Sequence, residues 1–235
     1  MRKSLDIVLP CYNPIANWHE RVVESLNLFS QLHNDVDLKL IVVNDGSKNV
    51  VNSDDIKYIQ DHISNFEYVN YEINRGKGHA LRVGVEKSKA DYIIYTDIDF
   101  PYLLKSFDDV YKELLKGFDV VVGVRSSEYY KKVPKTRIVI SKILKFFIKK
   151  SLGIYTTDTQ CGLKGFNQKG KSIFLSTRIE RYLFDLEFVY LASKDKDIKI
   201  SSSIVELREG VEFSTLNLRI ILSECFNFLR VFLFR

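Results

Sequence analysis

The sequence is poor in the residues that mark disordered, cross-linked or membrane-spanning chains. Of its 235 residues only 11 are glycine and 4 are proline, so long disordered linkers are not expected. The three cysteines are far apart and fit no zinc spacing, which indicates a reducing compartment. No stretch approaches the roughly 18 uncharged apolar residues of a membrane span, and the first residues predict a strand rather than a signal peptide. We therefore expect a protein that stays in the cytoplasm.

The loop after the first expected strand also lacks glycine. Residues 5–9 form an apolar strand, and Pro10-Cys11-Tyr12-Asn13-Pro14 follows it. A dinucleotide-binding fold would place G-x-G-x-x-G here, so that a pyrophosphate can approach the helix N-terminus. Its absence argues against a dehydrogenase. An aromatic ring and an amide suit a flat base instead, so we predict Pro10, Tyr12 and Asn13 as contacts to a nucleotide; a proline-rich turn is the alternative.

What the chain does contain is a regular alternation of short apolar runs and helical patterns. Strands are predicted at residues 5–9, 38–43, 66–71, 92–96, 118–124 and 198–205. Helices are predicted at residues 18–32, 56–63, 78–87 and 182–191. This alternation is typical of an α/β fold, with a mostly parallel sheet and helices on both faces.

The fourth expected strand runs directly into two carboxylates, Asp97 and Asp99. Side chains on an extended segment repeat every second residue, so both carboxylates point the same way. Two like charges repel each other, which favours a divalent cation between them and a phosphate. Carboxylate oxygens are hard ligands that suit Mg²⁺ or Mn²⁺. A solvated junction between strand and turn is the alternative.

Polar clusters follow the other strands at the same edge of the predicted sheet, where α/β folds bind ligands. Asn44-Asp45-Gly46-Ser47 is a good turn sequence, and the Asp45 carboxylate can accept a hydrogen bond from a base N–H. Residues 74–80 surround Lys77 with two glycines, a setting that favours a bound anion. An ordinary turn and an ordinary helix start are the alternatives.

Together these four loops resemble glycosyltransferase family 2, which has the GT-A fold. The matching segments are IVLPCYNP, VVNDGS, NRGKGHALRVGV and YTDID, in the order and spacing of the family. Pro14 is a departure, since many relatives carry an acidic residue there. The resemblance implies a GT-A (Rossmann-like) domain over residues 1–210. Its nucleotide-sugar half would be residues 1–100 and its acceptor half residues 101–210.

The second half resembles the dolichyl-phosphate β-glucosyltransferase branch of the family and its bacterial polyprenyl-phosphate relatives. The matching segments are VGVRSS (122–127), the basic segment 131–150, DTQCGLKGF (158–166) and RYLFDLEFVYLA (181–192). The resemblance implies that Asp158 and Gln160, in a loop over residues 156–166, line the sugar and acceptor pocket. Asp185 and Glu187 lie two apart on a predicted helix and point to different faces, and we favour Asp185 as the one at the site. The residues that we expect to be catalytic are Asp99, Asp158, Gln160 and Asp185.

The resemblance implies a metal-dependent glycosyltransferase that inverts the anomeric centre. The donor would be a nucleotide sugar, with UDP-glucose favoured over GDP-mannose. Its base would lie near Tyr12 and Asp45, and its diphosphate near Lys77. Asp97 and Asp99 would hold the Mg²⁺ or Mn²⁺ ion that stabilises charge on the departing diphosphate.

The nature of the acceptor decides how much base catalysis is needed. A lipid phosphate is already anionic near neutral pH and needs positive charges to position it. Arg125, Arg137 and Lys142 supply such charges, so we expect a polyprenyl- or dolichyl-phosphate acceptor. The alternatives are a glycan acceptor in cell-wall or capsule assembly and a non-catalytic nucleotide-sugar binding module. Nucleic acid is not expected as a partner, because no recognition motif accompanies the basic residues.

Two segments suggest contact with a membrane. Residues 131–150 hold eight basic residues and no acidic one, and their lysines and apolar residues fall on different faces of a helix. A basic amphipathic helix is typical of attachment to anionic lipid, although a buried helix with a solvated lysine stripe is the alternative. Residues 211–235 predict an amphipathic helix that lies in the membrane interface, docks on a membrane-protein partner or packs on its own domain. We therefore expect a peripheral protein on the cytoplasmic face of a membrane.

Overall fold

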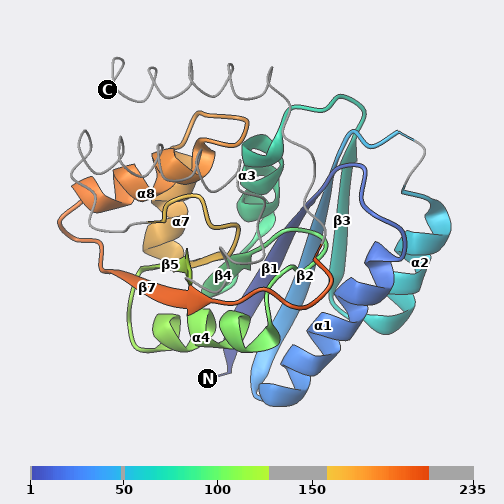
Figure 1. Cartoon of the computed structure of the whole chain (residues 1–235), viewed down its shortest axis with the longest axis horizontal. Coiled ribbons are helices and arrows are strands. Elements are labelled where there is room, and N and C mark those ends of the chain that lie inside the picture. The colour runs from blue at the N-terminus through green and yellow to red at the C-terminus, as the bar shows by residue number, and fades with distance from the viewer. Residues whose placement is uncertain (1, 49–50, 127–157, 212–235) are drawn as a thin grey trace.

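A computed structural model describes residues 2–48, 51–126 and 158–211 (Figure 1). In these residues seven strands form one sheet, in the order β3-β2-β1-β4-β6-β5-β7. The strands are β1 (Lys3–Cys11), β2 (Val36–Asp45), β3 (Phe66–Tyr71), β4 (Tyr92–Tyr95), β5 (Val120–Arg125), β6 (Lys164–Asn167) and β7 (Ile200–Val205). Only β6 runs antiparallel to its neighbours, β4 and β5. The predicted mostly parallel sheet is therefore confirmed, and both expected halves of the chain contribute strands to it.

Helices cover both faces of the sheet, as predicted (Figure 1). They are α1 (Trp18–Leu32), α2 (Ser53–His62), α3 (Lys77–Lys87), α4 (Leu104–Leu115), α7 (Gln168–Leu175) and α8 (Phe184–Lys194). The core has two parts, one under α1, α2 and α4 and the other under α3, α7 and α8. Successive side chains of β1 point to opposite faces of the sheet, so the strand contributes to both parts of the core. Ile7 and Leu9 belong to the first part and Val8 to the second.

Local sequence explains where two of the helices begin. The Asn52 side chain accepts from the Asp55 N–H at 2.8 Å, and the Asp55 side chain accepts from the Asn52 N–H at 3.2 Å. This capping box satisfies two free N–H groups at the start of α2. Asn167 caps α7 in a similar way, accepting from the N–H groups of Lys169 and Gly170.

A glycine lets α3 approach the sheet closely. A Cβ atom at Gly84 would lie 2.5 Å from Val8 Cγ1 and 3.0 Å from Val43 Cγ2. Any larger residue would push the helix away from the sheet. The close packing fixes the N-terminus of α3, and with it Lys77, beside the carboxyl ends of the strands.

The antiparallel strand β6 brings the segment before it to the same edge of the sheet. Because β6 pairs with β4 in the opposite direction, its first residue, Lys164, lies opposite Tyr95, the last residue of β4. Residues 158–163, called the 158–163 loop below, therefore lie next to the two aspartates that follow β4. The expected loop at 156–166 thus ends in a strand that the pattern did not predict.

Some expectations fall on residues outside the described part of the chain. The basic helix at 131–150 and nearly all of the C-terminal helix at 211–235 lie there, and the division into a domain and a tail stays a prediction. Within the described ranges no helix has the length and apolar character that are needed to cross a bilayer.

Candidate active site

Hydrogen bonds join the loops that follow the strands. The Asn13 N–H, after β1, donates to Ser47 Oγ, after β2, at 2.9 Å, and the Lys48 N–H donates to Asn13 Oδ1 at 3.3 Å. Asn13 has a left-handed backbone with φ of 46°, which an asparagine tolerates better than most residues. Tyr12 is exposed beside it. The ring is therefore accessible to a flat ligand, as the prediction for Pro10, Tyr12 and Asn13 requires.

Asp45 holds the loop that leads into α3. Its carboxylate accepts from Asn74 Nδ2 at 2.7 Å and from the N–H groups of Arg75 and Gly76 at 2.8 Å each. A carboxylate has about four acceptor positions, so these bonds use most of its capacity. The contact of Asp45 with a base stays a prediction, and the structure gives this residue a second role in shaping the loop that leads into α3.

Lys77 and Asp97 form the centre of the site. Lys77 Nζ lies 2.6 Å from Asp97 Oδ1, and the Asp97 side chain is 41% exposed. Burial lowers the pKa of Lys77, but the charges of Asp97 and Asp185 outweigh that effect, so its pKa is raised. The lysine is therefore a permanent cation beside Asp97, the first aspartate of the D-x-D motif that Asp97, Ile98 and Asp99 form.

Asp99, the second aspartate of the motif, lies in surroundings that disfavour its negative charge. Burial, followed by the charge of Asp97, raises the pKa of Asp99. A divalent cation placed between the two carboxylates would counter this effect, because it would offset both charges.

The donor set fits a metal that is shared with a ligand. Asp97 and Asp99 offer hard oxygen atoms, but no group of three or more His, Cys, Asp and Glu residues that could hold a metal ion occurs in the described residues. Mg²⁺ is commonly bound in this way, by one or two carboxylates together with phosphate oxygens and water. The two aspartates therefore fit a cation that arrives with a diphosphate.

The 158–163 loop lies against this centre. A Cβ atom at Gly162 would lie 2.5 Å from Asp97 Oδ2, so any larger residue there would displace the Asp97 carboxylate, while Lys77 Nζ, at 3.6 Å, would stay in ordinary contact. In the same loop Thr159 Oγ1 and Gln160 Nε2 are buried atoms without a hydrogen-bond partner among the described residues. Buried polar atoms without a partner are uncommon and point to a missing ligand or water. The role of Gln160 in substrate contact stays a prediction.

Asp158, predicted to be catalytic, is fully buried and paired with Arg125. Its Oδ2 atom accepts from Arg125 Nε at 2.6 Å, and its Oδ1 atom accepts from Nη2 at 2.5 Å. Such a two-point contact fixes the guanidinium plane. The structure thus brings Arg125 to the 158–163 loop, while Arg137 and Lys142, the other residues expected to bind the acceptor phosphate, lie outside the described residues.

Asp185 belongs to a buried ion pair below the site. Its Oδ1 atom accepts from Lys164 Nζ at 2.5 Å and from the Tyr95 hydroxyl at 2.6 Å. Glu187 is buried as well, but it accepts from the N–H groups of Arg178 and Ile179. The two acidic residues do point in different directions, and Asp185 is the one near Lys77.

The cysteines of the site are not poised as nucleophiles. Burial raises the pKa of the Cys11 thiol to about 12, and burial raises the pKa of Cys161 as well. Both are therefore neutral thiols near pH 7, and a neutral thiol is a poor nucleophile.

Sequence reasoning missed three residues of this region: Tyr102, Lys164 and Arg208. Tyr102 Oη accepts from the Gly162 N–H at 3.2 Å and so joins the segment after the D-x-D motif to the 158–163 loop. The sequence does contain a sign that Lys164 is buried, because a lone lysine in the apolar run GLKGF predicts a buried charge that needs a partner. Arg208 lies outside every motif, and the sequence contains no such sign for it.

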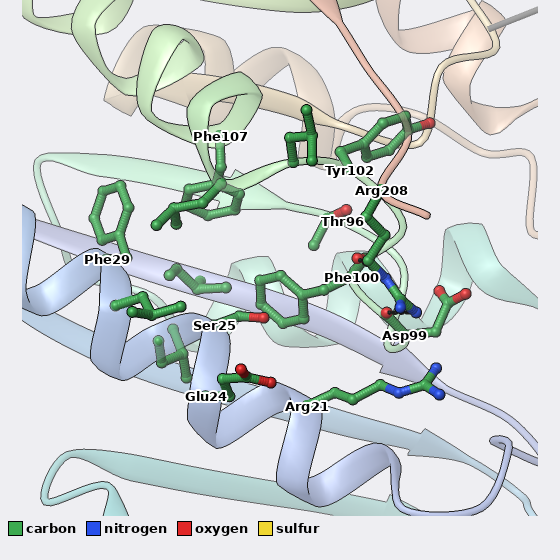
Figure 2. A pocket seen from close by; sticks show the side chains of 15 residues that line it. Arg21, Glu24, Ser25, Phe29, Thr96, Asp99, Phe100, Tyr102, Phe107 and Arg208 are labelled. Atoms are coloured by element: carbon green, nitrogen blue, oxygen red, sulfur yellow. Dashed lines mark hydrogen bonds between the residues drawn. The ribbon is translucent and has the colours of Figure 1, made fainter. Parts of the chain in front are cut away.

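A pocket of about 210 Å³ opens beside Asp99 (Figure 2). Asp99, Arg208 and Arg21 lie at one end of it, and Phe29 and Phe107 lie at the other. It is bounded by α1, α4 and the segment that follows the D-x-D motif.

Comparison with known proteins gives consistent results. The profile of the family described as "Glycosyl transferase family 2" matches residues 6–172. A dolichyl-phosphate beta-glucosyltransferase of Dictyostelium discoideum is 29% identical over 203 residues, which are 81% of this chain and 62% of that protein. A dolichyl-phosphate beta-glucosyltransferase of Trichomonas vaginalis is 27% identical over 98% of this chain and 73% of that protein. The human protein is 28% identical over 81% of this chain and 63% of that protein. The chain thus spans less than two thirds of the Dictyostelium and human relatives.

Two solved structures share the fold. A mannosyltransferase from Pyrobaculum calidifontis, in complex with GDP-Man and Mn²⁺, matches with a TM-score of 0.59 and 16% identity. The match covers 89% of this chain and 59% of that chain. S. aureus TarS matches with a TM-score of 0.56 and 15% identity, over 86% and 57% of the chains. The predicted GT-A fold is confirmed.

Proposed function

The chain belongs to glycosyl transferase family 2, as its motifs predict, and on that premise we propose that it transfers a sugar from a nucleotide to a polyprenyl or dolichyl phosphate, inverting the anomeric centre. Relatives at 25–29% identity carry the name dolichyl-phosphate beta-glucosyltransferase, which favours glucose as the sugar and a lipid phosphate as the acceptor. A UDP-linked glucose is the donor we propose.

The donor half of the site supports this proposal through its charges. Tyr12 is accessible to a base, and Lys77 lies beside Asp97, where it can reach a diphosphate. Asp97 and Asp99 would hold Mg²⁺ or Mn²⁺ together with the diphosphate, and the bound cation would stabilise the charge on the leaving nucleotide. The Mn²⁺ ion in the mannosyltransferase of similar fold supports the choice of metal.

One observation favours a phosphate over a sugar hydroxyl as the acceptor. Two of the three carboxylates expected to be catalytic are ion-paired, Asp158 with Arg125 and Asp185 with Lys164, and the third, Asp99, is assigned to the cation. A sugar hydroxyl needs a base to become a nucleophile, and a carboxylate that is held by a cationic side chain is not free to take its proton. A phosphate is already anionic and needs a cation to orient it, and Arg125 is a cation held in a fixed plane. Arg137 and Lys142 would add charge around the same phosphate.

The lipid acceptor implies a protein that works on the cytoplasmic face of a membrane. The expected basic helix at 131–150 would bind anionic lipid, and the expected tail at 211–235 would bind the interface or a membrane-protein partner. Flotation of the full chain with anionic and neutral liposomes measures this. Recovery with anionic liposomes alone is the expected result, and no recovery with either would contradict it.

The proposal is tested by supplying UDP-glucose and Mn²⁺ with either a short polyprenyl phosphate or free sugars. We expect product on the lipid phosphate and none on the sugars. The reverse result would favour a glycan acceptor, as in cell-wall or capsule assembly. Failure to consume any nucleotide sugar, with or without an acceptor, would favour a binding module.

Asp158→Asn separates positioning from base catalysis. Since the structure uses Asp158 to hold Arg125, we expect a higher KM for the lipid phosphate and a smaller change in kcat. A residue that acts as a general base would instead lower kcat by about 10²- to 10⁴-fold with KM retained. Asp109→Asn makes the same change in an exposed ion pair on α4, away from the site, and serves as the control.

A further inference from the structure

The segment that follows β7 lies along the segment that follows the D-x-D motif. The Leu103 N–H donates to the Glu206 carbonyl at 2.9 Å, and the Arg208 N–H donates to the Pro101 carbonyl at 3.0 Å. Tyr102 and Leu207 form an antiparallel bridge between them. Residues separated by about one hundred positions in the chain are thus paired through their backbones, directly beside Asp99.

The turn that carries Asp99 has an unusual backbone. The Phe100 N–H donates to the Asp97 carbonyl at 3.0 Å, which closes a turn over the D-x-D motif. Phe100 has a φ of 45°, in the left-handed region that a bulky residue rarely adopts. Its ring is nearly buried and packs against Phe107. Backbone of this kind persists only where its surroundings hold it in place.

Arg208 supplies such a constraint. Its Nε donates to the Phe100 carbonyl at 3.0 Å, and its Nη2 donates to the Asp99 carbonyl at 3.1 Å. One planar guanidinium therefore holds the two successive peptide groups on either side of Phe100. Figure 2 shows its guanidinium next to Asp99 at the end of the pocket. The side chain forms no ion pair with a carboxylate in the part of the chain that is described.

We propose that Arg208 is a positioning residue for the metal site. By fixing the Asp99 and Phe100 carbonyls it fixes the direction in which the Asp99 side chain leaves the backbone. It acts on the cation through Asp99 and touches neither the nucleotide nor the sugar. The inference rests on the metal dependence in the proposed function.

Arg21 provides a matched control. It lines the same pocket from α1, and its guanidinium lies near Asp99 in Figure 2. It forms no hydrogen bond with the D-x-D turn in the described residues. Loss of Arg21 therefore removes a positive charge from the same neighbourhood and leaves both carbonyls of the turn bound to Arg208.

The test is a titration with Mn²⁺ in the presence of UDP, in which the electron paramagnetic resonance signal of free Mn²⁺ measures binding. Residues that orient a metal ligand typically contribute about 10- to 100-fold in metal affinity, so we expect Arg208→Gln to weaken Mn²⁺ binding by that factor. Arg208→Lys keeps the charge but loses the planar fork, and we expect it to weaken binding as well. Arg21→Gln should change affinity less than twofold, and UDP binding in EDTA should be equal in all variants.

Each other outcome is decisive. Unchanged Mn²⁺ affinity in Arg208→Gln, or full recovery in Arg208→Lys, would overturn the positioning role. So would a loss of UDP affinity in EDTA as large as the loss for Mn²⁺, because it would place Arg208 on the nucleotide. If the unaltered protein bound no Mn²⁺ with UDP, the proposed metal dependence itself would fail. Trp18 fluorescence during urea unfolding shows which variants fold, and Arg208→Lys alone carries the test if the glutamine variant does not.

Discussion

Removal of the Lys164 charge should show how much the buried ion pair between Lys164 and Asp185 contributes to the stability of the fold. Lys164 is fully buried, and its ammonium group donates to Asp185 Oδ1 and to the Cys161 carbonyl at 2.5 Å each. It also lies 5.7 Å from the centre of the Tyr95 ring. Lys164→Met leaves the Asp185 carboxylate buried with the Tyr95 hydroxyl and without its ion-pair partner.

The expected magnitude follows from the cost of an unpaired buried charge. Removal of one partner of a buried ion pair typically costs about 3–5 kcal/mol. Lys164→Met and Asp185→Asn should each lower the free energy of unfolding by that amount, a large part of the roughly 5–15 kcal/mol that holds a typical domain folded. The double variant has no unpaired charge, and the amide that replaces the Asp185 carboxylate can still accept from Tyr95. Its main loss is the donor to the Cys161 carbonyl, about 1–3 kcal/mol.

Urea unfolding measures these free energies, with the fluorescence of Trp18 as the signal. Trp18 is the one tryptophan of the chain and is 2% exposed, so unfolding changes its surroundings completely. We expect the double variant to be more stable than either single variant. If the losses of the two single variants simply add in the double variant, the two side chains are independent and the ion-pair argument is refuted.

Two further substitutions address the site and its pH response. Gly162→Ala places a methyl group against Asp97 Oδ2 and should lower activity by about 100-fold, as displacements of about 1 Å can, with little change in the thermal midpoint; full activity would show that Asp97 can move freely. Burial, and then the charge of Arg75, lowers the pKa of His79, so below pH 6.5 the unfolded chain takes up a proton that the folded chain resists. Stability should therefore fall as the pH drops from 6.5, less steeply in His79→Gln; parallel curves for the two proteins would contradict this.

The predicted part of the site consists of residues that lie close to strand ends in the sequence. Asp45 ends β2, Lys77 opens α3 and Asp97 follows β4, and parallel strands place such residues at one edge. Asp97 and Asp99 lie beyond the last residue of β4, in a turn that the Phe100 N–H closes onto the Asp97 carbonyl, so the strand alternation from which we expected their common direction does not reach them. Family resemblance added the 158–163 loop, which the structure places against Asp97.

The rest depends on contacts that no local pattern encodes. Arg208 binds the Asp99 carbonyl across 109 positions, and Asp158 reaches Arg125 across 33. The contact between Asp158 and Arg125 depends on β6, which lies antiparallel between β4 and β5. A strand of four residues is too short to predict from periodicity. The sequence therefore predicts Asp158 and Asp185 as catalytic residues but does not predict their ion pairs with Arg125 and Lys164.

The most direct test of the central claim is the binding of UDP with and without Mn²⁺, measured by calorimetry. We predict that Mn²⁺ tightens UDP binding at least about tenfold, that Asp99→Asn abolishes this gain, and that Asp109→Asn, which alters an exposed ion pair on α4, retains it. Equal affinity for UDP in Mn²⁺ and in EDTA, in the unaltered protein, would contradict the claim that the two aspartates bind a cation together with the diphosphate.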